Sequence, residues 1–358
     1  MRRYKFLSSG AAFFLGTLVI IIFISLGSQN PKEALSEFFL KPFSSVWYFG
    51  NMLNKTSLLL FAASGSLFAF KCGCFNLGGE GQIYFAGLLT GILLQNTWTE
   101  PVVQLILTGL IVFFASGLIG LVSGFLKIKF NADELLTSFL ISAAILPVVN
   151  YLIGNPLRDT SGNLLALPPI AETFELKSFL PPSSLNISFV FSIILVLFFI
   201  LFFAKTKQGY RLRLSGTAPE FSKFAGFSVY APLLAGMGIS AGLHGLTGFF
   251  AITGTWYICH LSFSSGMGWS ALAIALIAKN SFFAIIPAAF LYSWIQSASD
   301  AAVMSGSLVF DTAVFLQAVV FLFISANLLS LNLSLRFTLG LSKNISRIKT
   351  LLLKRKGI

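Results

Sequence analysis

The chain has 358 residues, of which 56% are hydrophobic and only 10% are charged. Soluble domains carry about 25% charged residues, so this composition excludes a water-soluble fold and indicates an integral membrane protein. The net charge of +12 would suggest nucleic-acid binding in a soluble protein, but in a membrane protein Lys and Arg mark the cytoplasmic side. We therefore expect one transmembrane domain over residues 1–358 and no nucleic-acid partner.

Apolar segments long enough to cross a bilayer recur along the whole chain. A spanning helix needs about 20 mostly apolar residues. About ten segments approach this length, at 10–27, 57–70, 83–96, 102–126, 135–153, 188–204, 231–252, 267–278, 282–297 and 310–329. They predict an all-α polytopic membrane protein. Glycines interrupt the pattern around residues 73–81 and 254–268, which predicts broken or re-entrant helices there.

The first apolar segment follows Arg2, Arg3 and Lys5, as the core of a signal peptide would. Its apolar core is about 18 residues long, whereas a signal peptide has roughly 7–15, so we predict a retained first helix. Cleavage would instead leave nine spans and place the two ends on opposite sides of the membrane.

The basic residues predict the orientation. With the N-terminus inside, the cations outside are Lys32, Lys41, Lys55, Arg158 and Lys177. All other lysines and arginines fall inside, including those of a basic tail at 336–358. Because cations collect on the cytoplasmic side, both termini are predicted in the cytoplasm, in a multi-pass protein of the cytoplasmic (inner) membrane.

Two outside segments separate the predicted spans. Residues 28–56 carry aromatic side chains among charges, which is typical of an amphipathic segment lying on the membrane surface. Residues 154–187 are rich in Pro, Ser and Leu, and this segment is predicted to be an outside loop that acts as a lid or a docking surface.

A polar stretch lies between two apolar runs at residues 75–82. It contains Asn76, Glu80 and Gln82 among three glycines. A charge at the centre of a membrane helix costs about 2.5–3.5 kcal/mol, so such a group persists where it lines a wet cavity or has a partner. The stretch is either a broken helix that lines a substrate path or a polar cytoplasmic turn with Glu80 in water.

The cytoplasmic segment 205–230 contains a predicted short helix. Thr217 is a candidate N-cap, Pro219 suits the first turn, and Glu220 complements the helix dipole. Phe221 and Phe224 give this helix an apolar face, which needs a partner groove. The segment is therefore predicted to dock onto a soluble motor subunit, with a helix lying on lipid headgroups as the alternative.

A third stretch, residues 253–280, combines glycines with aromatic side chains. Trp256 is a candidate for stacking on a flat substrate, and Ser264 for a polar contact along the path. The chain has 40 phenylalanines, so lipid-facing aromatic side chains are the alternative.

The sequence contains no recognisable catalytic or metal-binding arrangement. Its cysteines (Cys72, Cys74, Cys259) and histidines (His244, His260) have no metal-ligand spacing and no disulfide framework. No Ser–His–Asp set and no phosphate-binding loop are present, so this chain is predicted to be a non-enzyme that binds no cofactor itself. If ATP provides the energy, a separate subunit hydrolyses it.

These stretches resemble a known family, the inner-membrane permeases of ATP-binding-cassette (ABC) importers for branched-chain amino acids, simple sugars and nucleosides. Asn76-Leu77-Gly78-Gly79-Glu80-Gly81-Gln82 is similar to the Asn-Ile-Gly-x-Glu-Gly-Gln pattern of the nucleoside branch. Leu126-Lys127-Ile128-Lys129-Phe130 with Asp133-Glu134 resembles a second motif. Here Asp133 replaces the usual Asn, and Phe139-Leu140-Ile141-Ser142 stands where the family has Met-Leu-Asn-Tyr.

Two further motifs extend the resemblance over nearly the whole chain. Ser264-Ser265-Gly266-x-Gly268 resembles the glycine-rich outer loop of the family. The resemblance also implies ATPase-docking residues at Gly216, Pro219, Glu220, Phe221, Ala225 and Gly226.

The resemblance implies a machine of several subunits. Its parts would be an ABC ATPase that binds ATP, a second permease, and an extracytoplasmic substrate-binding protein, with membrane lipid around them. The expected cargo is a nucleoside, with purine nucleosides favoured, moved by alternating access. The alternatives are the same machine for sugars or amino acids, a secondary transporter, and an intramembrane enzyme or scaffold.

Overall fold

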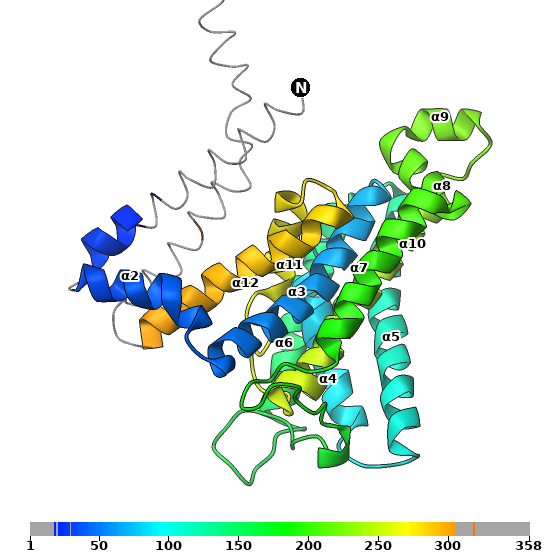
Figure 1. The fold of residues 1–358 in the computed structure, drawn as a ribbon. Coiled ribbons are helices and arrows are strands. Elements are labelled where there is room, and N and C mark those ends of the chain that lie inside the picture. Colours follow the sequence, from blue (N-terminus) through cyan, green and yellow to red (C-terminus); the bar gives the residue numbers. More distant parts are fainter. Residues whose placement is uncertain (1–17, 19–20, 29, 305–317, 319–358) are drawn as a thin grey trace, which may run out of the picture. The chain divides into compact units, whose positions relative to one another are not determined.

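The structure is a computed structural model that describes residues 18, 21–28, 30–304 and 318 (Figure 1). The chain divides into two compact units, one made of residues 1–39 with 299–358 and the other of residues 40–298. The regular secondary structure of the described residues is helical, and these residues contain no strand beyond an isolated bridge between Ala166 and His260. The predicted all-α class is confirmed for this part of the chain, and a single permease domain stays a prediction.

Six helices of the described residues are long and apolar enough to cross a membrane. They are α3 (Val46–Lys71), α5 (Pro101–Phe130), α6 (Glu134–Gly154), α7 (Ser188–Lys205), α10 with its π-helical end η3 (together Tyr230–Trp256) and α12 (Phe282–Met304). Each contains one predicted span. Most of the spans predicted at 10–27 and 310–329, and the whole tail at 336–358, lie outside the described residues.

Helix α3 begins well before the predicted start at residue 57. Ser45 caps it by accepting a hydrogen bond from the Tyr48 amide at 3.3 Å. Trp47 and Tyr48, which the sequence suggested for a surface segment, are therefore part of α3. The preceding residues form the short helices α2 (Pro31–Leu40) and η1 (Lys41–Phe43).

Two predicted spans, 83–96 and 267–278, correspond to helices that are short for a full span. Helix α4 (Gly79–Leu93) has 15 residues and α11 (Met267–Ile277) has 11. At 1.5 Å per residue they are about 22 and 16 Å long, less than the roughly 30 Å of a hydrocarbon core. Both interruptions predicted from glycines are present, since α3 ends at Lys71 before α4 begins, and an irregular connection joins η3 (Ile252–Trp256) to α11.

Polar side chains at the loop junctions set where several helices begin. Glu100 accepts from the Val103 amide at the start of α5, at 2.9 Å. Asp133 does the same for the Leu135 amide at the start of α6, also at 2.9 Å. Because Asn and Asp are equally good N-caps, Asp133 in place of the family's Asn preserves this function.

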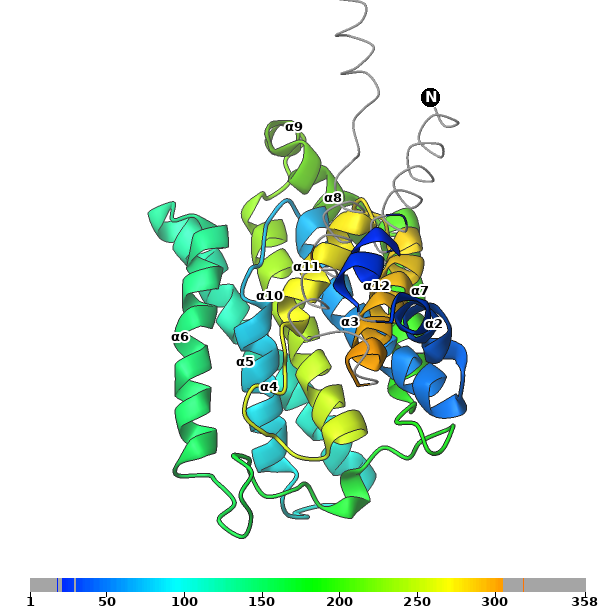
Figure 2. The same cartoon turned by 90° about the vertical axis from the view of Figure 1, so that its left-hand side faces the viewer.

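Helix α10 lies at the centre of the larger unit and packs against α5, α3 and α4 (Figures 1 and 2). Small residues bring the backbones together: a Cβ on Gly245 would lie 2.6 Å from Ser116 Oγ of α5. Such close approach is typical of helix packing in membranes. The segment with α8 (Lys207–Thr217) and α9 (Pro219–Phe224) lies at one end of this bundle and the 155–187 loop at the other.

Candidate functional site

The carboxylate of Glu80 joins the starts of the two short helices. Glu80 lies in the first turn of α4 and accepts hydrogen bonds from Ser264 Oγ (2.5 Å), the Gly266 amide (3.0 Å) and the Gly268 amide (2.8 Å). All three donors come from the connection into α11 or its first turn. The structure thus brings together two predicted residues, Glu80 and Ser264. The 75–82 stretch forms the end of the turn between α3 and α4 and the first turn of α4, where Glu80 has protein partners.

Asn76 and Gln82 lie fully inside the bundle, in a buried polar network. The Asn76 amide nitrogen donates to Gln82 Oε1 (3.0 Å) and to Ser240 Oγ of α10 (3.1 Å), and Gln82 Nε2 donates back to Asn76 Oδ1 (3.2 Å). Protein partners therefore satisfy these amides, which connect the α3–α4 turn to α10.

His244 of α10 extends the same network, and sequence reasoning missed it. Its Nδ1 lies 2.8 Å from Gln82 Oε1, and its Nε2 lies 3.3 Å from Ser66 Oγ of α3. Since an amide oxygen only accepts, the His244 Nδ1 donates to Gln82 Oε1. A histidine within an apolar span was the one sequence signal for this contact.

The connection from η3 to α11 runs back along α4 (Figure 2). The Tyr84 hydroxyl accepts from the Ser262 amide at 2.9 Å and donates to Asn150 of α6 at 2.6 Å. The Phe263 ring lies 5.5 Å from the Tyr84 ring and fills the space that Gly87 leaves open. Helices α4 and α6 and the connection therefore form one contiguous surface.

This surface mixes aromatic and polar side chains. Its exposed residues, called here the mixed face, are Phe139, Asn150, Trp256, Ser262, Ser265 and Trp269. The Phe139 ring of α6 lies 6.1 Å from the Trp269 ring of α11, and the Trp256 ring lies 5.1 Å from the His260 ring. Trp256, 44% exposed, contacts His260 and not the Glu80–Ser264 pair.

The loop at residues 155–187, predicted to lie outside, is hydrogen-bonded to the end of α10. Three loop amides donate to carbonyls beyond that end: Leu176 to Thr253 at 2.8 Å, Ile170 to Tyr257 and Leu167 to Cys259, both at 3.0 Å. The loop is thus an ordered cover over η3.

Two carboxyl groups of the same loop have shifted pKa values. Hydrogen bonds from Ser161 lower the pKa of Asp159. Burial, and then the charge of Glu172, raise the pKa of Glu175.

Helix α9 and the two residues after it carry five of the six candidate docking residues. Pro219 occupies its first turn, and Ala225 and Gly226 end it. The exposed Glu220 lies 3.3 Å from Lys223 Nζ. Phe221 is 60% exposed, and Phe224, on the same helix, is 97% exposed.

The predicted cap of α9 is wrong. Ala218 is its N-cap and provides no side-chain hydrogen bond. Thr217 instead ends α8, where its hydroxyl donates to the Arg213 carbonyl at 2.9 Å. A threonine hydroxyl can bond back to the preceding turn, and that local competition cannot be read from the residue order.

Gly216 differs from the other docking candidates because it is packed against the bundle. A Cβ on Gly216 would lie 2.5 Å from the Gly73 nitrogen and from the Lys71 carbonyl oxygen. Gly73 belongs to the turn between α3 and α4 and has a positive φ of 77°. The backbone of α8 therefore touches the turn that leads to the Asn76–Gln82 network.

No metal centre accompanies these features in the part of the chain that the structure describes. That part has no group of three His, Cys, Asp or Glu that could hold a metal ion. Its three cysteines are buried and unpaired by disulfides.

Comparisons with known proteins identify the family. Residues 48–325 match the family described as "Branched-chain amino acid transport system / permease component". The chain is 40% identical over 323 residues to the "Probable riboflavin import permease protein RfuC" of Treponema pallidum, covering 90% of this chain and 86% of that protein. It is 24% identical to the guanosine ABC transporter permease protein NupP of Bacillus subtilis, covering 92% and 94%.

A third relative is the nucleoside ABC transporter permease protein NupB of Lactococcus lactis, which is 25% identical over 80% of each chain. The family match and the 40% identity both extend over most of the chain. The chain therefore belongs to the ABC-importer permease family for branched-chain amino acids, sugars and nucleosides, and it is a transport subunit rather than an enzyme.

Proposed function

We propose that this permease imports riboflavin, or a cargo of the same chemical kind, a flat heteroaromatic ring attached to a hydroxylated chain. The observation that carries the proposal is the 40% identity to a riboflavin import permease over 90% of this chain. Nucleosides, predicted from the Asn76–Gln82 motif, are the second candidate. Two nucleoside permeases, at 24% and 25% identity, favour them.

The mixed face is the proposed wall of the translocation path. A ring-and-hydroxyl cargo needs aromatic surfaces for stacking and polar groups for hydrogen bonding. Trp256 and Trp269 offer rings, and Asn150 and Ser265 offer polar groups, on one surface of α6, α11 and their neighbours. The outward faces of α5 and α7 are apolar instead and suit lipid.

A second permease subunit is proposed to complete the path opposite the mixed face. An extracytoplasmic binding protein delivers cargo to the 155–187 loop. An ABC ATPase docks on α9, whose exposed Phe221 and Phe224 need an apolar groove. The contact between Gly216 and Gly73 then links α8 to the turn before α4, which gives ATP-driven movement a direct route into the membrane domain.

Uptake measurements test the cargo. Uptake of labelled riboflavin and of labelled guanosine is measured in cells that contain the partner subunits. This chain is present, deleted, or restored from a plasmid. We expect ATP-dependent riboflavin uptake to require the chain. Loss of guanosine uptake alone would favour the second candidate, and unchanged uptake of both compounds would refute both.

A further inference from the structure

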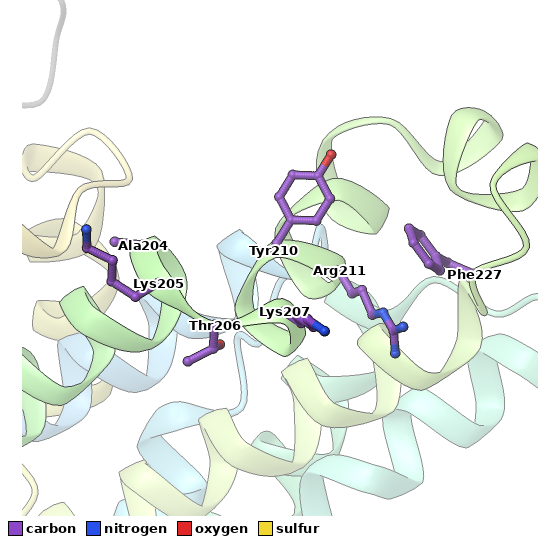
Figure 3. A pocket seen from close by; sticks show the side chains of 7 residues that line it. All are labelled: Ala204, Lys205, Thr206, Lys207, Tyr210, Arg211 and Phe227. Carbon is purple, nitrogen blue, oxygen red and sulfur yellow. The ribbon is translucent and has the colours of Figure 1, made fainter.

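A basic pocket lies where α7 ends and α8 begins. Its volume is about 420 Å³, and seven residues line it (Figure 3): Ala204, Lys205, Thr206, Lys207, Tyr210, Arg211 and Phe227. Three of them are cationic and none is acidic. Lys205, Lys207 and Arg211 form no ion pair with any carboxylate that the structure describes. The pocket thus concentrates positive charge that no carboxylate of the described residues pairs with.

Two of the three cations of the pocket lie close together, and Lys205 projects to the other side (Figure 3). Lys207 and Arg211 are one helical turn apart on α8 and project to the same side in Figure 3. The Arg211 guanidinium lies over the Phe227 ring at 5.1 Å, which limits its orientations. The Tyr210 ring points away from both cations in Figure 3. Lys207 and Arg211 are therefore the donors that fit the oxygens of a phosphate group.

An apolar surface leads to this pocket along α7. Phe191, Ile194, Phe198 and Leu201 are exposed and recur every three or four residues, on the helix face that ends in Lys205. The first three also line an apolar groove of about 820 Å³ between α5 and α7. The groove ends at Phe198, about 10 Å along the helix axis from Lys205. This separation is shorter than an acyl chain.

We propose that the basic pocket binds the phosphate headgroup of an anionic lipid, whose acyl chain follows α7 into the groove between α5 and α7. The apolar surface and the charge together favour a lipid over a free phosphate, which would use the pocket alone. Basic pockets at the cytoplasmic end of membrane helices bind such headgroups. A bound lipid would hold α8, the first helix of the 205–230 segment, against α7.

The test compares lipid retention by matched variants. The purified transporter complex is stripped of lipid in detergent, incubated with vesicles of equal phosphatidylglycerol and phosphatidylcholine, and examined by native mass spectrometry. Lys207→Gln with Arg211→Gln removes two pocket cations. Lys129→Gln with Lys279→Gln removes two exposed cations at the same end of the bundle and serves as the control.

We expect the pocket variant to retain roughly thirtyfold less phosphatidylglycerol, the effect of two cations near an anionic headgroup. The control variant should retain as much as the unmodified complex. Gly109→Leu tests the acyl chain separately. Gly109 lines the groove, and a Cβ there makes only ordinary contacts with Phe249, from 3.7 Å. A filled groove should lower lipid retention without any change in charge.

Three results would overturn the proposal. One is equal phosphatidylglycerol retention by the pocket and control variants. Another is full displacement of the lipid by millimolar inorganic phosphate, which would make the pocket a site for the free ion. The third is a pocket variant that retains lipid normally but loses the ATPase subunit in lipid-free detergent. This result would make the pocket a subunit interface.

Discussion

At the scale of single residues, the Glu80 carboxylate is the point where the two short helices meet. Three donors from the α11 side converge on its two oxygens. Hydrogen bonds to an ionised group contribute more than those between neutral groups, about 1.5–3 kcal/mol each. The partial exposure of Glu80 leaves its role along the path a prediction, but its part in holding the α11 connection follows from geometry.

Glu80→Gln is expected to lower the free energy of unfolding by about 2 kcal/mol, because the amide keeps only one accepting oxygen and has no charge. Thermal unfolding in detergent measures the loss, and hydrogen exchange should rise over residues 262–268. Glu100→Gln is the control, since exposed Glu100 accepts from a single amide at the start of α5. Unchanged exchange in the Glu80 variant would contradict this assignment.

Substitutions in the buried network of Asn76, Gln82 and His244 are expected to lower the free energy of unfolding. Gln82→Ala deprives Asn76 and His244 of a partner inside the bundle, and an unsatisfied buried polar group costs about 1–3 kcal/mol. Asn76→Ala should have a similar effect. Because each residue satisfies the other, the double variant should lose less stability than the two single losses added together. Strict additivity in this cycle would show that the two amides are not coupled.

At the scale of elements, hydropathy predicted the existence of the long helices better than their limits. Helix α3 starts early because Asn54 and Thr56, which weaken the apolar pattern, have partners inside the fold. Asn54 donates to Thr255 at 2.8 Å, and the Thr56 hydroxyl donates to the Met52 carbonyl at 2.8 Å. The Asn54 partner lies some two hundred positions away, so a sequence window cannot detect it.

For the candidate site, the sequence predicted which segments take part but not which residues contact one another. Glycine breaks and intramembrane polar residues marked the segments that form it, since both are costly in a lipid-facing helix. That Glu80 pairs with Ser264, and Gln82 with His244, depends on how separate helices meet. Composition and spacing do not contain that information.

Helix α9 gives a prediction about coupling. Glu220→Ala is expected to reduce cargo uptake per ATP hydrolysed, while the protein still inserts and folds, because an exposed ion pair contributes only about 0–1 kcal/mol to stability. Uptake and ATP hydrolysis are measured together in proteoliposomes. Lys223→Gln is the control, since it breaks the same ion pair and leaves Glu220 in place. Equal uncoupling by both variants would assign the effect to the ion pair and refute docking through Glu220.

At the scale of the whole molecule, the 155–187 loop and the α8–α9 segment lie at opposite ends of one bundle (Figures 1 and 2). The positions of the basic residues predict that the first end faces outward and the second faces the cytoplasm. The described helices are compatible with that arrangement, because one long helix, α7, connects the 155–187 loop to the α8–α9 segment. The orientation itself stays a prediction.

Cysteine labelling tests the orientation in intact cells. Cys72, Cys74 and Cys259 are buried, so they provide a low background without being replaced. Lys177→Cys, in the exposed outer loop, should react with a membrane-impermeant maleimide at once. Gln208→Cys, exposed on α8, should react only after the cells are permeabilised. The reverse pattern would invert the topology.

The close contact of Gly216 with Gly73 has a mechanical consequence. No side chain lies between the two backbones, so α8 is in direct contact with the turn that leads into α4. We expect α8 and this turn to move together.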